Sequence, residues 1–444
     1  MKNHFNLVPI LLAAAVTIPG TVLRFSHIEL SPPMTALMAG IAILGASFLV
    51  LWACEVIQMD VSQTLAIALV ALIAVLPEYA VDMYFTWMAG KQHTEVYEAL
   101  EHGRELGDVY AHFAIANMTG ANRLLIGIGW PVIVFVAWTK MRKPIRLEAE
   151  RATELVFLLL ATTWGFVVFF KNSLMWYDAI IFISFFVGYM MIASRRPCEE
   201  VCLEGPSEYI GSCSTVPRRT WTWLMFAFAA AVIVANAEPF SEGLVGTGEV
   251  FGISKFLLVQ WLAPLASEAP EFTVAILLAM RGSPSMALGA LVSSKLNQWS
   301  LLVGMIPAAY ALSSGQMSLP IPMDHHQMLE ILLTAAQSIL AIALLSDFRL
   351  SFKEALLLIV LFLGQFVLSP WFDSMHASGA TVWDGSHIRI LFTIVYVTFA
   401  AYHFIRYPFR LKKLLQGFKV APDFCDLSLG DNGVEAVKDG SGKS

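Results

Sequence analysis

The chain contains 444 residues, of which 57% are hydrophobic and 14% are charged, and its formal net charge is −6. A soluble domain carries about 25% charged residues, so the composition excludes an ordinary soluble protein. Together with a mean hydropathy of +0.67, it predicts a protein that lies largely within a membrane.

Apolar runs of about 20 residues, long enough to cross a bilayer as a helix, recur along the whole chain. They predict an all-α polytopic membrane protein with about twelve spans, near residues 6–23, 33–55, 62–90, 109–138, 152–170, 174–194, 220–240, 250–280, 284–311, 327–346, 352–370 and 387–405. Two polar segments interrupt this bundle. Residues 91–108 are expected to contain a short helix on the outer side, and residues 195–219 join the two halves of the chain on the inner side.

The distribution of Lys and Arg predicts the orientation. With the N-terminus inside, 20 of the 28 basic residues face the cytoplasm, six face the outside and two lie within spans. Because basic loops are retained in the cytoplasm, we expect both termini there, in an integral protein of the bacterial inner (plasma) membrane.

The most informative motif is a pair of Pro-Glu dipeptides, Pro77-Glu78 and Pro270-Glu271, each inside a long apolar run. A carboxylate in the middle of a spanning helix is costly unless it serves a cavity or a partner. The proline removes a backbone hydrogen bond and frees a carbonyl, which a membrane tolerates only where protein or water covers it. The same device in each half of the chain predicts a transporter with an ion site between two repeats.

The repeat extends beyond these dipeptides. Each Pro-Glu span is followed by a span with a polar stretch, at residues 117–122 and 293–298. Each unit has five spans, and an odd number inverts the second unit, which places Glu78 and Glu271 at a common midplane site. The predicted organisation is an inverted-repeat 5+5 transporter core with one extra helix at each end: 1–32 extra N-terminal helix, 33–194 first inverted repeat with the outer insert 91–108, 195–219 cytoplasmic hinge loop, 220–371 second inverted repeat, 372–407 extra C-terminal helix, and 408–444 cytoplasmic tail, largely disordered.

Two further carboxylates accompany the Pro-Glu pair. Asp82 follows Glu78 by one helical turn on the same face, and Glu268 precedes Glu271 by three residues. Each is interpreted either as an ion ligand or proton carrier, or as a packing partner of its neighbour.

Two cations, Arg123 and Lys295, also lie within spans. In one interpretation they are charge partners that neutralise Asp82 and Glu268 and leave an oxygen-lined cation site. In the other they fill the space that ions would use, and protonation of the clustered carboxylates drives transport.

These motifs resemble a known family. LPEYAVD followed by HFAIANMTGANRLLIG, and ASEAPEFTVAILLAMRGSPSMALGALVSSKLNQWSLLVG, are similar to the two alpha repeats of the calcium/cation antiporter superfamily, the membrane domain of sodium/calcium exchangers, over about residues 33–370. The resemblance implies that both Pro-Glu glutamates, nearby hydroxyls and an amide in the following helix coordinate sodium and calcium. The candidate metal ligands are Glu78 and Glu271. The further candidate ion-binding residues are Asp82, Glu268, Ser267, Asn117, Ser294 and Gln298.

The chain departs from the family pattern at several positions. Ala74 and Val75 stand where hydroxyls are expected, Glu268 replaces another hydroxyl, and Lys295 stands at a position that is normally Asn. The resemblance therefore supports the fold more directly than it supports calcium as the substrate.

The favoured function is secondary antiport of Ca²⁺ or Na⁺ in exchange for Na⁺ or H⁺ by alternating access. One alternative is a transporter of the same fold with an altered substrate, either proton-coupled or an anion paired with Arg123 and Lys295. Another is a membrane scaffold that transports nothing. Common motifs of hydrolases and nucleotide-binding enzymes are absent from the sequence, so we expect no enzyme activity and no cofactor. The expected partners are the lipid bilayer and small cations, with no nucleic acid and no obligate protein partner.

Overall fold

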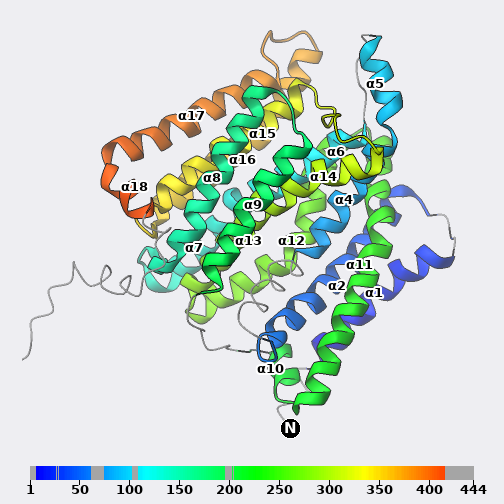
Figure 1. The fold of residues 1–444 in the computed structure, drawn as a ribbon, viewed down its shortest axis with the longest axis vertical. Helices are drawn as coiled ribbons and strands as arrows, with labels where there is room; N and C mark the ends of the chain where they lie inside the picture. Colours follow the sequence, from blue (N-terminus) through cyan, green and yellow to red (C-terminus); the bar gives the residue numbers. More distant parts are fainter. Residues whose placement is uncertain are drawn as a thin grey trace, which may run out of the picture.

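The computed structural model describes residues 7–26, 28, 30–61, 75–102, 109–195, 203 and 205–415, and helices make up nearly all of it (Figure 1). The helices are α1 (Leu7–Ser26), α2 (Pro32–Ile57), α4 (Leu76–Lys91), α5 (His93–Glu101), α6 (Tyr110–Leu124), α7 (Trp130–Met141), α8 (Ala152–Lys171), α9 (Trp176–Ala193), α10 (Pro206–Gly211), α11 (Thr215–Phe251), α12 (Lys255–Arg281), α13 (Pro284–Asn297), α14 (Val303–Ser314), α15 (His325–Leu345), α16 (Phe352–Ala377), α17 (Gly385–Arg406) and α18 (Pro408–Leu415). Two π-helical turns, η2 (Leu125–Gly129) and η4 (Gln298–Leu302), and a 3-10 turn, η3 (Ala149–Arg151), adjoin them. The expected all-α class is confirmed, apart from one antiparallel pair of two-residue strands, β1 (Ile145–Arg146) and β2 (Arg349–Leu350).

Ten helical runs in the described part of the chain are long and apolar enough to cross a membrane, and they lie close to ten of the predicted spans. The predicted span 284–311 is also helical, as α13, η4 and α14, but it is not among the ten. Of the predicted span 62–90, only the part from residue 75 onward is described, as α4. The total of twelve spans therefore stays a prediction.

The largest difference from the predicted bounds is at α11, which was expected over residues 220–240. The helix has 37 residues, because Pro239 lies inside it without ending it and Gly252, in the left-handed conformation at φ 64°, follows its last turn. The predicted hinge is described only in part, and residues 205–219 contain α10 and the first turn of α11. The predicted disordered tail falls mostly on residues 416–444, which lie outside the described residues.

Local sequence explains where many helices begin and end. Pro32, Pro77 and Pro284 lie in the first turns of α2, α4 and α13, where a missing N–H costs no helical hydrogen bond. Asp324 accepts hydrogen bonds from the first backbone N–H groups of α15. Gly282 ends α12 in the left-handed conformation at φ 100°, which glycine adopts without strain.

Three groups of helices lie side by side (Figure 1). α1, α2 and α11 pack together at one edge of the bundle, and α15, α16 and α17 pack together toward the opposite edge. Between them lie α4, α6, α12, α13 and α14. The extra N-terminal helix α1 is thus attached to α2 and α11, whereas the extra C-terminal helix α17 is attached to α15 and α16.

Packing of the central helices is reciprocal between the two halves. α4, the Pro-Glu helix of the first half, packs against α14 of the second, and α12, the Pro-Glu helix of the second half, packs against α6 of the first. Each polar stretch leads into a π-turn, η2 in the first half and η4 in the second. Inverted repeats produce this arrangement, and it gathers α4, α6, α12 and α13 around a common centre.

Ion pairs tie the end of α2 to the beginning of α11. Asp60, just after α2, accepts hydrogen bonds from Arg218 Nε at 2.9 Å and Nη2 at 2.7 Å, and from Arg219 Nε at 3.1 Å. The hydrogen bonds from Arg218 hold the pKa of the Asp60 carboxyl below its ordinary value. The carboxyl is therefore charged at neutral pH and holds the two helix ends together.

Asp60→Asn is expected to lower the melting temperature of the detergent-purified protein at neutral pH, because two guanidinium groups lose a charged acceptor. A carboxyl with a lowered pKa stabilises the fold above its ordinary pKa, and this contribution is lost as the pH falls through the lowered value. The difference between the variant and the wild type should therefore shrink in acid. Arg24→Gln, which breaks an exposed pair with Glu238, is the control and should change little. An equal loss in R24Q, or a D60N difference that persists in acid, would contradict this role.

Candidate functional site

The four predicted carboxylates lie on α4 and α12, one Pro-Glu helix from each half of the chain. Glu78, Asp82 and Glu268 are almost fully buried, with exposed fractions of 1%, 0% and 2%. Glu271 is half-buried. These four residues are called the carboxylate cluster below.

The carboxyl groups of the carboxylate cluster interact electrostatically. The carboxyls of Glu78 and Glu268 lie close together across the contact between α4 and α12, and Asp82 and Glu271 are near enough for their charges to act on Glu78. Like charges at such range in a low-dielectric interior cannot all persist without protons or cations nearby. The carboxylate cluster therefore requires bound protons or nearby cations.

Side chains from α6, α13 and η4 line the carboxylate cluster. Asn117 on α6 donates from Nδ2 to Asp82 Oδ1 at 3.3 Å. Gln298, the first residue of η4, donates from Nε2 to Glu268 Oε1. Ser294 on α13 lies beside the glutamate of the second Pro-Glu dipeptide. The structure thus brings these three predicted residues next to the predicted carboxylates.

The two Pro-Glu dipeptides are set differently in their helices. Pro77 lies in the first turn of α4, whereas Pro264 and Pro270 lie inside α12, which continues through both. On α12, the Ser267 hydroxyl donates to the carbonyls of Ala263 at 3.3 Å and Pro264 at 3.2 Å. Its donor is therefore used within its own helix.

Two further hydrogen bonds join the central helices. The Tyr79 hydroxyl donates to Asn297 Oδ1 at 2.7 Å and links α4 to α13. Lys295 Nζ donates to Asn122 Oδ1 at 2.7 Å and links α13 to α6. Lys295 is fully buried, with its ammonium 4.7 Å from the centre of the Trp299 ring. One of the two predicted charge partners therefore lies among the helices that hold the carboxylate cluster.

Close packing of α6 on α12 depends on one glycine. A Cβ at Gly120 would collide with the backbone carbonyl of Gln260, so the absence of a side chain lets the two helices approach. This approach brings Asn117 and Asn122, which flank Gly120 on α6, to the centre of the bundle.

Several buried oxygens at this centre have no hydrogen-bond donor among the residues that the structure describes. They are Glu78 Oε1 and Oε2, Asp82 Oδ2, Glu268 Oε2, Ser294 Oγ and Gln298 Oε1. Buried polar atoms are nearly always paired, and oxygens of this kind are the ligands of hard cations such as Ca²⁺. Within the described ranges, no three His, Cys, Asp or Glu side chains are close enough to hold a metal ion together. A cation here would therefore also need amide, hydroxyl or backbone oxygens.

The other predicted charge partner, Arg123, belongs to a separate group of charges. Its Nη2 pairs with Glu330 Oε2 on α15, and Glu330 Oε1 accepts from Arg389 Nε on α17 at 2.6 Å. Arg389 Nη2 also lies 3.7 Å from Asp373 Oδ2. These four residues, called the Glu330 cluster, contain two cations and two anions. Arg123 forms its ion pair with Glu330 and with none of the predicted ion-binding carboxylates in the described chain.

Glu330 and Arg389 are buried charges that the sequence pattern did not predict. Both lie near the ends of predicted spans, where a charged side chain normally reaches the interface, yet they are only 2% and 4% exposed. Gln260 on α12 donates to Glu330 Oε2 at 2.9 Å and joins this cluster as well. The signal that could have found them was a pair of opposite charges inside two apolar runs.

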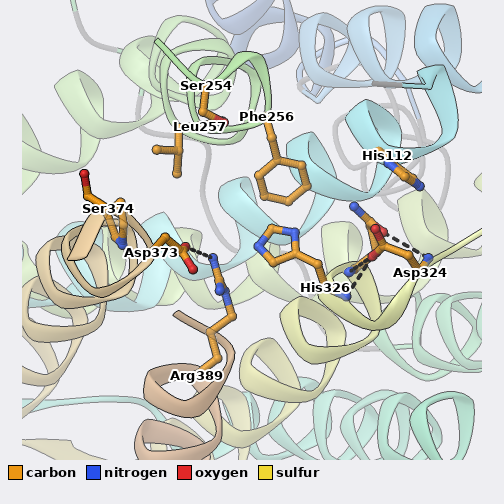
Figure 2. Close-up of a pocket in the computed structure, with 11 residues that line it drawn as sticks. His112, Ser254, Phe256, Leu257, Asp324, His326, Asp373, Ser374 and Arg389 are labelled. Carbon is orange, nitrogen blue, oxygen red and sulfur yellow. Dashed lines mark hydrogen bonds and ion pairs between the residues drawn. The ribbon is translucent and has the colours of Figure 1, made fainter. Parts of the chain in front are cut away.

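A pocket of about 650 Å³ opens beside the Glu330 cluster, at the end of the bundle where α6, α12, α15 and α17 begin. Figure 2 shows the His326 ring between Phe256 and Arg389. The centres of the His326 and Phe256 rings are 4.6 Å apart, and His326 Nε2 lies 3.8 Å from Glu330 Oε1. The lining of this pocket includes no member of the carboxylate cluster, so the two features are separate.

Inverted helical repeats, with acidic and amide side chains from both halves meeting between them, define a secondary membrane transporter. The sequence pattern of the sodium/calcium exchanger protein family matches residues 31–195 and 221–371 of this chain. The chain belongs to that family. It is an integral membrane protein of the cation exchangers.

Two solved structures and one curated sequence are similar to the chain. The crystal structure of an H⁺/Ca²⁺ exchanger, CAX, is 36% identical, covers 95% of this chain and 99% of its own, and has a TM-score of 0.83. YfkE, a Ca²⁺/H⁺ antiporter protein, shares the fold at 16% identity and a TM-score of 0.59, with 80% of this chain and 97% of YfkE covered. CaxA of Alkalimonas amylolytica, assigned as an antiporter, is 22% identical over 191 residues, or 41% of this chain. The chain spans 56% of the length of that relative.

Glu330→Gln is expected to destabilise the protein by about 3–5 kcal/mol, because it leaves two buried guanidinium groups without their shared anion. The measurement is unfolding of the detergent-purified protein. Glu249→Gln, which loses an exposed pair with Lys255, is the matched control and should change stability by no more than about 0.5 kcal/mol. Adding Arg123→Met to E330Q should recover part of the loss. If E330Q unfolds no more easily than E249Q, the Glu330 cluster does not hold α6, α15 and α17 together.

Proposed function

We propose that this protein is a secondary antiporter that moves Ca²⁺ or Na⁺ in exchange for H⁺ or Na⁺ by alternating access at the carboxylate cluster. Ca²⁺ against H⁺ is the favoured pair. Glu78 and Glu271 act as the principal cation ligands, and the other ion-binding residues are Asp82, Glu268, Ser267, Asn117, Ser294 and Gln298.

The observation that supports this function best is the set of buried, unpartnered oxygens around Glu78 and Glu268. The carboxylate oxygens among them come from α4 and α12, one helix from each of two repeats with opposite orientations in the membrane, and the others come from α13 and η4. A cation bound between them is exposed to one side or the other when one group of helices moves against the rest. The first helices of the two repeats, α2 and α11, pack together at the edge of the site and are the elements proposed to slide.

Proton exchange is favoured for two reasons. The 36% identical structure is that of an H⁺/Ca²⁺ exchanger. In addition, carboxyls that lie close together, as Glu78 and Glu268 do, favour the binding of a proton by at least one of them when no metal ion is present. The same oxygens can then serve Ca²⁺ in one half of the cycle and H⁺ in the other.

An anion substrate is disfavoured by the placement of the two intramembrane cations. The charge of Arg123 is matched by Glu330. Lys295 is then the predicted charge partner that remains near the four-membered carboxylate cluster, with Glu78 near enough to act on it. An anion entering this site would meet an excess of negative charge. No contact in the described chain favours a scaffold that transports nothing.

We also propose an inner-membrane location with both termini in the cytoplasm. The support is the asymmetry of basic residues, 20 on the side of the termini against six on the other. The basic helix α18, which includes Arg410 and Lys412, suits a position at anionic headgroups on that side.

Glu78→Gln and Glu271→Gln are each expected to reduce ion exchange by at least about tenfold, since a loss of only 1.4 kcal/mol of ion binding is a tenfold loss. The measurement is the initial rate of Ca²⁺ uptake into proteoliposomes under an imposed pH gradient, and in parallel under a Na⁺ gradient. Glu249→Gln makes the same chemical change on an exposed residue and should transport like the wild type.

Exchange that continues at the wild-type rate in both E78Q and E271Q would show that the carboxylate cluster is not the transport site. If the wild-type protein moves none of Ca²⁺, Na⁺ and H⁺ under any imposed gradient, the proposed function itself is rejected. The gradient that drives uptake identifies the coupling ion.

A further inference from the structure

The buried lysine at the centre of the bundle contacts an amide oxygen and an aromatic ring rather than a carboxylate. Lys295 is 0% exposed. Its ammonium donates to Asn122 Oδ1 at 2.7 Å and lies over the face of Trp299 at 4.7 Å. Glu78 is near enough for its charge to act on the ammonium, but among the described residues no carboxylate forms a direct ion pair with Lys295.

Lys295 also lies close to the two-fold axis that relates the two repeats. The π-turns η2 and η4 mark equivalent points of the two repeats, and Asn122 and Lys295 each lie three residues before the start of theirs. Two residues at equivalent positions of repeats related by a two-fold axis can touch only close to that axis. The contact between Lys295 and Asn122 therefore places the ammonium near the axis, where the two repeats meet.

The surroundings of this ammonium are also those that a monovalent metal ion would use. An amide oxygen and nearby carboxylates are hard ligands, and the face of a Trp ring attracts a cation. The charge of the neighbouring Arg123 is already matched in the Glu330 cluster. Lys295 therefore supplies a positive charge to the carboxylate cluster, and its tether keeps that charge in place when a transported ion leaves.

We propose that the Lys295 ammonium is a resident monovalent cation of the transport site, standing in place of a bound sodium ion, so that exchange does not require sodium. This inference rests on the proposed cation antiport and deepens it, because it identifies the residue that sets how many mobile cations the site binds. A neutral side chain at this position leaves one negative charge uncompensated, together with a free amide oxygen on Asn122. Such a site has the charge and the ligands to take up a sodium ion.

The test compares Lys295→Gln, Lys295→Arg and Arg123→Gln with the wild type in two measurements. Binding of ²²Na⁺ to the detergent-purified proteins does not require transport. Ca²⁺ uptake into proteoliposomes under a pH gradient, with and without Na⁺ on both sides, reports exchange. Arg123→Gln is the matched control, because it also removes a buried cation next to Asn122, but one that belongs to the Glu330 cluster.

K295Q is expected to bind about one more Na⁺ per chain than the wild type, and its Ca²⁺ uptake should rise by about tenfold with Na⁺, a size typical of coupling between two bound ligands. The wild type should transport equally well without Na⁺, and neither K295R nor R123Q should gain Na⁺ binding. Retained melting temperature and a single chromatographic peak establish that each variant is folded.

A folded K295Q that gains no Na⁺ binding, or that transports without Na⁺ at the wild-type rate, overturns the inference. Gain of Na⁺ binding in K295R or R123Q does so as well. If K295Q does not fold, Ca²⁺ uptake by the wild type with and without Na⁺ tests the inference. Wild-type uptake that rises about tenfold with Na⁺ overturns the inference but leaves the proposed cation antiport intact. A wild type that exchanges no cation rejects the proposed function, and the ²²Na⁺ measurement still tests the role of Lys295.

Discussion

The arrangement of the central helices depends on one physical constraint, the cost of holding several carboxylates away from water. A charge buried in a low-dielectric interior costs several kcal/mol unless cations, protons or hydrogen-bond donors compensate it. Asn117 and Gln298 supply donors to Asp82 and Glu268, and Lys295 supplies charge. The contact of α6 with α12 at Gly120 and the π-turns beside the polar stretches, a distortion common at functional sites, position these compensating groups.

Two of the buried groups of charges in the described part of the chain, the Glu330 cluster and the carboxylate cluster, differ in their charge balance. In the Glu330 cluster, Arg123, Arg389 and Gln260 occupy both oxygens of Glu330, and positive and negative charges are balanced. Such a group joins helices and leaves neither oxygen of Glu330 free to bind a cation. In the carboxylate cluster, negative charge exceeds positive charge and oxygens of Glu78 remain without donors. A group with this excess of negative charge is suited to the binding and release of cations.

Much of the fold could be predicted from the sequence, because long apolar runs and the asymmetry of basic loops depend only on local composition. The span predicted at 152–170, for example, is α8 (Ala152–Lys171). The end of α11 could not be predicted, since hydropathy detects its apolar part alone. The Pro-Glu carboxylates stood out because each interrupts an apolar run. The partners of Arg123 and Lys295 could not be told apart, because both are single cations in apolar spans, and their different surroundings depend on which helices are neighbours in space.

The length of α11 links the candidate site to the lipid around it. Its 37 residues span about 55 Å at a rise of 1.5 Å each, whereas the hydrocarbon layer is about 30 Å thick, so the helix must tilt or project beyond the headgroups. The contact with α2 and the ion pairs of Asp60 make the two helices tilt together, and α11 also contacts α4 and α12. Bilayer thickness therefore acts on the helices that bear the carboxylates, and the lipid composition of the host membrane becomes a variable of the proposed exchange.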